Sequence, residues 1–84
     1  SDPAEQTHKV MQNIIQLIEE TGGSINDLVK LVVYITDIKT REPIYIVIVE
    51  YTKGVYPVST GLVVKSLARP EWLVEIDATA VISS

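Results

Sequence analysis

The sequence contains no cysteine and no phenylalanine, and it has only one histidine and one tryptophan. Without cysteine the chain can form no disulfide and has no thiol nucleophile, and a metal site would lack its commonest soft ligand. His8 has no second histidine or cysteine to join it, so neither a metal site nor a catalytic triad can be built around it. We therefore expect no metal, no cofactor and a surface position for His8.

Positive charge is also scarce. Seven Lys and Arg stand against eleven Asp and Glu, which gives a net charge of −4, and the cationic residues are scattered. A nucleic-acid binder normally carries a basic stripe that neutralises phosphates, so we expect no nucleic-acid partner. The apolar runs are far shorter than a membrane span, and the first residues do not resemble a secretory leader. These absences predict a cytoplasmic protein with no membrane partner.

The chain is short. Its 84 residues make one domain at most and bury only a modest core. A domain of this size usually needs further support, such as oligomerisation or an additional stretch of chain. The sequence starts with Ser-Asp-Pro rather than Met, which is consistent with a processed or truncated form. We treat residues 1–84 as a single domain.

The first element is predicted to be a helix. Asp2 can cap it, Pro3 suits its first position, and Glu5 completes a capping-box pattern. Gly22-Gly23 ends it, because glycine adopts the left-handed cap without steric cost. The apolar residues between them recur at helical spacing and comprise Val10, Met11, Ile14, Ile15, Leu17 and Ile18, with Thr21 at the end.

Strands are predicted in three places. Leu28 to Thr36 is mostly β-branched or aromatic, which predicts a strand buried on much of both faces. Val58 to Ser66 and Trp72 to Ile82 are two further strands, joined as a hairpin through a turn that contains Pro70. Alternation in the last strand places Glu75 and Asp77 on its polar face.

The stretch from Thr40 to Tyr51 is ambiguous. The run IYIVIV loses side-chain freedom in a helix and suits a strand. Thr40-Arg41-Glu42-Pro43 instead indicates a helix start, and a helical stripe follows it. We predict a helix that begins near Arg41. Its sheet-facing residues are expected to be Ile44, Val47, Ile48 and Tyr51. The element order is then α-β-α-β-β, an α+β domain with its helices on one side of an open sheet.

Two long stretches resemble the Rid (YjgF-like) enamine/imine deaminase family. QTHKVMQNIIQLIEETGGSINDLVKLVVYITDI, residues 6–38, resembles that family's helix, Gly-Ser-Asp turn and following strand. EYTKGVYPVSTGLVVKSLARPEWLVEIDATAV, residues 50–81, resembles its C-terminal hairpin with the closing VEIDA. The resemblance implies a chorismate-mutase-like α+β fold and a homotrimer, with three sheets around a central barrel and ligand clefts between subunits. It also implies a helix at residues 40–51 and hydrolysis of 2-aminoacrylate-type enamines and imines to keto acids and ammonia.

The sequence departs from the family pattern at several positions. The family's carboxylate-binding arginine falls at Ser59, and a serine cannot supply a bidentate charged contact. An asparagine expected in the second helix falls at Tyr45, whereas Glu75 matches the glutamate that orients the hydrolytic water. The family's first β-hairpin, which adds further site residues, has no counterpart in this chain.

The candidate site therefore consists of Glu75 as the catalytic residue, with Ser59, Thr60, Gly61 and Tyr45 binding substrate. Each has a plainer alternative. Glu75 could be a solvated carboxylate, Ser59 and Thr60 could simply begin a strand, and Gly61 could relieve crowding. Arg69 lies ten residues beyond Ser59 and would have to fold back to reach the site, so we do not expect it to replace the missing arginine.

These observations predict a Rid-like homotrimer that binds a small metabolite at its subunit clefts, with weak or lost deaminase activity. Two alternatives stay open. One is a non-catalytic trimeric scaffold for ligand binding or protein interaction, and the other is a fragment of a longer Rid protein. Fold alone does not decide between them.

Overall fold

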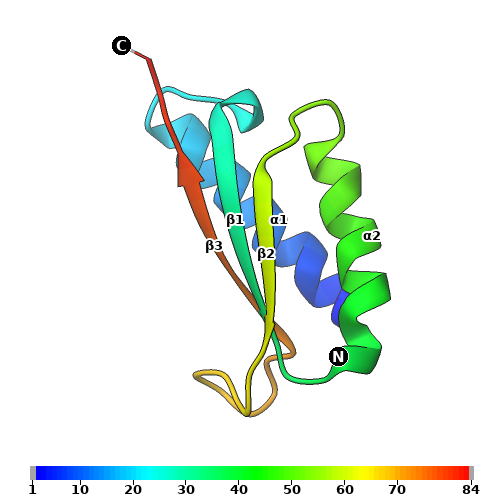
Figure 1. Ribbon diagram of the computed structural model, residues 1–84. Helices are drawn as coiled ribbons and strands as arrows, with labels where there is room; N and C mark the ends of the chain where they lie inside the picture. The colour runs from blue at the N-terminus through cyan, green and yellow to red at the C-terminus, as the bar shows by residue number, and fades with distance from the viewer. Residues whose placement is uncertain (1, 84) are drawn as a thin grey trace.

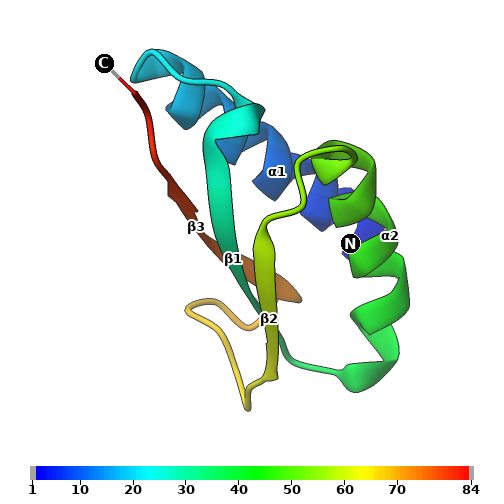
Figure 2. The same ribbon diagram turned by 45° about the horizontal axis from the view of Figure 1, so that its top comes forward.

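The computed structural model describes residues 2–83 and shows two helices packed on one face of a three-stranded sheet (Figures 1 and 2). The order is α1 (Pro3–Glu20), β1 (Leu28–Ile35), α2 (Arg41–Thr52), β2 (Val58–Val63) and β3 (Val74–Ala80). Two short 3-10 turns, η1 (Ile25–Asp27) and η2 (Ile38–Thr40), flank β1. The predicted α+β class and the order α-β-α-β-β are confirmed.

Helix α1 starts and stops as its sequence predicts. The Asp2 carboxylate accepts a hydrogen bond from the backbone N–H of Ala4 at 2.7 Å, and Gly22, with φ of 91°, follows its last turn. Its buried side is slightly rotated from the predicted stripe, since Leu17 is 64% exposed. The residues that α1 buries fully are Thr7, Met11 and Ile18.

Residues 41–52 form helix α2, as predicted, although six β-branched or aromatic residues follow one another there. Ile44, Val47 and Ile48 are buried and Tyr51 is half-buried, so the predicted stripe faces the core. Burial of that stripe outweighs the small preference of the same residues for a strand. Ile46 and Val49 remain exposed on the opposite side.

The predicted hairpin between the last two strands is wrong. The sheet order is β2-β1-β3, with β2 parallel and β3 antiparallel to the central strand β1. Helix α2 carries the chain from β1 to its parallel neighbour β2, which leaves the other edge of β1 for β3. Residues 64–73 then pass around one end of the sheet instead of forming a tight turn (Figure 1).

Strand β1 is buried on one face only, not on both as its composition predicts. Leu31, Val33 and Ile35 are buried beneath the helices, whereas Lys30 is exposed and Tyr34 is half-buried on the other face. No element within residues 2–83 covers that second face. We refer to it below as the open face.

Candidate functional site

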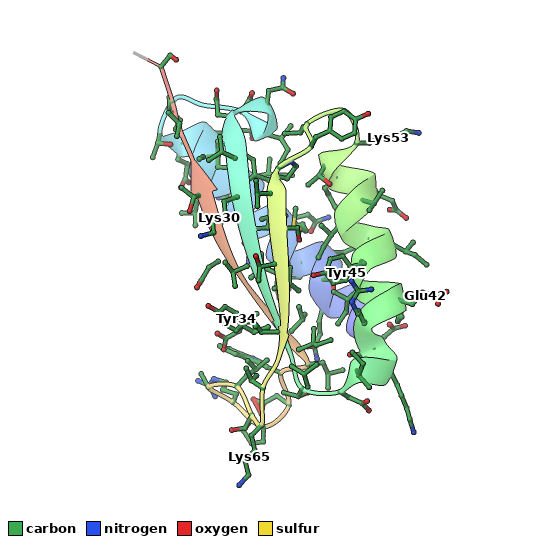
Figure 3. The ribbon with its side chains drawn as sticks, in the orientation of Figure 1. Lys30, Tyr34, Glu42, Tyr45, Lys53 and Lys65 are labelled. Atoms are coloured by element: carbon green, nitrogen blue, oxygen red, sulfur yellow. The ribbon has the colours of Figure 1, made fainter. Side chains whose placement is uncertain are left out.

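The candidate site residues do not share one face of the sheet. In the register, Val32 lies between Thr60 on β2 and Asp77 on β3, and Tyr34 lies beside Glu75. Because neighbours across a ladder point the same way, Thr60 and Glu75 belong to the open face. Figure 3 shows Tyr34 and Lys30 on this side of the sheet.

Ser59, Gly61 and Tyr45 lie on the helix side. Ser59 is paired with Leu31, and Gly61 with Val33, both of which are buried beneath the helices. The Tyr45 side chain reaches from α2 towards β2 (Figure 3), and its hydroxyl would lie 2.5 Å from a Cβ built on Gly61. Gly61 therefore makes room for the Tyr45 hydroxyl, which favours its structural interpretation.

Tyr45 also has a partner on its own helix. The guanidinium of Arg41, one turn earlier, lies 4.5 Å from the centroid of the Tyr45 ring. Such a stack at an exposed position contributes about 0.5–1 kcal/mol. Tyr45 therefore packs between Arg41 and Gly61, at the outer edge of the sheet.

Glu75 lies in a polar cluster on the open face. Its Oε1 accepts a hydrogen bond from the backbone N–H of Ala68 at 3.3 Å, and the side chain is half-buried. Next to it, the Tyr34 hydroxyl donates to Oδ2 of Asp77 at 3.2 Å. Partial burial, this hydrogen bond and the charges of Asp77 and Glu75 raise the pKa of Tyr34 above its ordinary value of 10.0.

Sequence reasoning missed Tyr34 and Asp77. The alternation along β3 places Asp77 on the same face as Glu75, but alternation alone indicates no role for it. The antiparallel register of β1 against β3, which brings Tyr34 alongside, is a long-range pairing that no local pattern specifies.

Residues 64–73 return to Glu75 at one end of the sheet. The hydrogen bond from Ala68 to Glu75 places the adjacent Arg69 at that end of the sheet. The Arg69 guanidinium lies 6.0 Å from the Trp72 ring centroid, and the Arg69 carbonyl accepts a hydrogen bond from the Trp72 backbone N–H at 3.1 Å.

Gln6 on α1 fixes the end of this loop. Its Nε2 donates to the Glu71 carbonyl at 3.0 Å, and its Oε1 accepts from the Leu73 N–H at 2.8 Å. A groove of about 590 Å³ opens beside it, between α1 and β3. The groove is lined by Gln6, Lys9, Val10, Asn13, Glu71, Trp72, Val74, Glu75 and Ile76.

His8 is less exposed than the surface position that the sequence predicts for it. It is half-buried, and its Nδ1 lies 3.0 Å from the Tyr51 hydroxyl on α2, with the two rings edge to face. Within residues 2–83, no three His, Asp or Glu side chains gather closely enough to hold a metal ion. Neither of the two described helices is long and apolar enough to cross a membrane.

Curated relatives match nearly the whole chain. A RutC family protein from Pyrococcus abyssi is 35% identical over 79 residues, which are 94% of this chain and 61% of that protein. A second RutC family protein, from Pyrococcus horikoshii, is 33% identical over 94% of this chain and 62% of its own length. The chain thus spans about three-fifths of the length of these relatives.

Solved structures share the fold. A YjgF family member from Mycobacterium tuberculosis superposes with a TM-score of 0.93 at 30% identity, over 96% of this chain and 69% of that one. A YjgF family member from Neisseria meningitidis gives a TM-score of 0.92 at 31% identity, over 99% of this chain and 70% of that one. The family model described as Endoribonuclease L-PSP matches residues 1–82. The chain therefore belongs to the YjgF (Rid) family.

Proposed function

We propose that this chain forms a homotrimer that binds a small metabolite between subunits, with weak or lost activity towards 2-aminoacrylate-type enamines and imines. The observation that carries the proposal is the division of the candidate residues between two sides of the sheet. Glu75 and Thr60 lie on the open face, while Ser59, Gly61 and Tyr45 lie on the helix side.

One small ligand cannot contact both sides of a sheet within a single chain. It can do so when the open face of one copy approaches the β2 edge of another. Both surfaces are suited to such a contact, because the open face carries Leu62, which is 46% exposed, and β2 is an edge strand with no buried residue. Exposed apolar residues next to an unpaired strand edge favour association.

The chemistry that the resemblance implies needs a held substrate, a placed water and a route for protons. Water adds to the C=N bond of the imine, the C–N bond then breaks, and a keto acid and ammonia leave. Glu75 can orient that water and accept its proton, because the Ala68 amide fixes one carboxylate oxygen and leaves the other available.

Ser59 is the reason to expect low activity. A charge-assisted hydrogen bond contributes about 1.5–3 kcal/mol, so losing the contact that an arginine would make costs at least about tenfold to a hundredfold in rate or affinity. In this chain Ser59 is an exposed residue on the helix side of an edge strand, where it offers one hydroxyl.

RNA cleavage, which the description of the family model names, is not the function that we propose. The chain has a net charge of −4, and its seven cationic residues form no stripe along the sequence. Its one histidine is engaged with Tyr51 instead of lying beside a second acid–base group. Such a charge balance opposes binding of a phosphate backbone.

The test is a coupled assay in which a dehydratase generates 2-aminoacrylate and pyruvate release is followed. We expect the natural chain to be slow, Ser59→Arg to be faster, and Glu75→Gln to lose the activity that remains. Gln12→Arg and Glu50→Gln are the controls, because the first introduces an arginine and the second removes a carboxylate at exposed positions of α1 and α2.

Two results would count against the proposal. A natural chain as fast as an arginine-bearing relative would show that the inference from Ser59 is wrong. Activity that survives Glu75→Gln would remove Glu75 from the chemistry. If every variant is inactive, including Ser59→Arg, the non-catalytic scaffold is the better description.

A further inference from the structure

The loop formed by residues 64–73 is held at both ends. The Val64 N–H donates to the Ile35 carbonyl at 2.8 Å and so extends the pairing of β2 with β1. At the other end, Gln6 bonds to the backbone on both sides of Trp72. Between these anchors the Ala68 N–H donates to Glu75. The backbone position of Arg69, one residue beyond the amide that bonds to Glu75, is therefore fixed.

The side chain of Arg69 is arranged to bind a further group. Its guanidinium lies above the Trp72 ring at the outer limit of a cation–π contact, which leaves its N–H groups available for hydrogen bonds. Among residues 2–83 no ion pair of Arg69 is present, although Glu71 and Glu75 are close in the chain. Arg69 thus carries an unpaired cation one residue from the Ala68 amide that bonds to the candidate catalytic carboxylate.

We propose that Arg69 binds the anionic group of the ligand, in place of the arginine that Ser59 replaces. The ligand would be a small carboxylate, a 2-keto or 2-imino acid, with its carboxylate on Arg69 and its reacting carbon towards Glu75. This inference rests on the proposed function for the ligand class, but it assigns the anion contact to a different element. Arg69 and Glu75 come from the same subunit, whereas Ser59 lies on the other side of the sheet.

Trp72 provides a direct measurement, because it is the only tryptophan in the chain and lies against Arg69. Pyruvate is titrated into the full 84-residue chain while tryptophan fluorescence is followed, with calorimetry as a second reading of Kd. We expect saturable binding of pyruvate, and binding of the neutral amide pyruvamide that is at least about tenfold weaker, because a charged acceptor is lost.

Three variants test the assignment. Arg69→Gln should weaken pyruvate binding by about tenfold to a hundredfold, and Arg69→Lys should recover part of the loss because it keeps the charge without the bidentate geometry. Lys53→Gln is the control, since Lys53 is an exposed cation at the C-terminal end of α2. It removes the same charge and should leave the Kd unchanged. Circular dichroism checks that all variants are folded.

The outcomes separate this inference from the proposed function. Binding that depends on Arg69 in a chain without deaminase activity supports the inference and counts against catalysis. Deaminase activity with pyruvate binding unaffected by Arg69→Gln keeps the proposed function and overturns the inference. The inference is also overturned if pyruvamide binds as well as pyruvate, if Lys53→Gln weakens binding equally, or if pyruvate does not bind.

Discussion

At the scale of single residues, the contact between Gly61 and Tyr45 shows what the sequence leaves open. From the sequence, Gly61 could admit a ligand or relieve crowding, and Tyr45 occupies a position where the family has asparagine. In the structure, the nearest atom to a Cβ on Gly61 is the Tyr45 hydroxyl oxygen. The two residues are adjacent because α2 packs beside β2, and that packing is a tertiary fact that neither local pattern contains.

This contact predicts a coupled effect on stability. Gly61→Ala should lower the free energy of unfolding by about 1–3 kcal/mol, because the new methyl group would overlap the hydroxyl 2.5 Å away. Tyr45→Phe removes that oxygen and should restore most of the loss. Urea unfolding of both single variants and the double variant gives the coupling energy. Strictly additive effects would show that the Tyr45 hydroxyl is not what disfavours a side chain at position 61.

A second prediction concerns Tyr34, whose pKa is raised mainly by partial burial and then by Asp77 and Glu75. A raised pKa in the folded state favours the neutral hydroxyl. Its contribution to stability is therefore complete below pH 10 and is lost as the pH rises through the folded-state value. Tyr34→Phe should lose less stability above pH 10 than the natural chain.

Absorbance titration of the tyrosines provides the direct check. We expect part of the absorbance change to come from Tyr34 at a pH above 10. Asp77→Asn should move that part to lower pH, because the variant removes a nearby negative charge. Thr79→Asn, on the same face of β3, is the control. A titration that Asp77→Asn leaves unchanged would contradict the hydrogen-bonded cluster.

At the scale of elements, helices were predictable and strand pairing was not. The cap at Asp2 and the stripe of α2 are local features, and both appear where the sequence places them. The hairpin prediction failed because adjacency in sequence was taken as adjacency in the sheet, whereas β1 lies between β2 and β3. The same long-range pairing brings Tyr34 to Glu75 and Asp77, so the polar cluster could not be predicted either.

Helix α2 gives a matched test of burial. Ile44 is fully buried and Ile46 is 54% exposed, two residues apart in the same helix. Ile44→Val should cost about 0.5–1.5 kcal/mol of unfolding free energy because it removes a packed methylene. Ile46→Val should change it by less than about 0.5 kcal/mol. Equal losses in thermal unfolding would mean that α2 does not bury the face that carries Ile44, Val47 and Ile48.

At the scale of the whole molecule, one face and one edge of the sheet have no partner within the single chain. The open face has no covering element within residues 2–83, and the edge strand β2 has no buried residue. The candidate residues are distributed over both sides of this sheet. Our central proposal is that the candidate residues on the two sides of the sheet, Ser59 and Glu75 above all, meet only between copies of the chain.

Light scattering comes first. Three chains of 9.3 kDa should give a particle of three times that mass, and a stable monomer at micromolar concentration would already contradict the claim.

The decisive measurement mixes two chains that are each deficient. One is the natural chain, which has Glu75 but no arginine at position 59, and the other is the double variant Ser59→Arg, Glu75→Gln.

After joint unfolding and refolding, a mixed trimer can place the arginine of one copy opposite Glu75 of another. We predict that the mixture releases pyruvate from 2-aminoacrylate faster than either parent alone, and faster than an unmixed combination of the two. Ser59→Arg alone sets the upper limit, because every one of its sites can hold both groups. A refolded mixture whose rate equals the average of its parents would show that Ser59 and Glu75 do not meet across a subunit boundary.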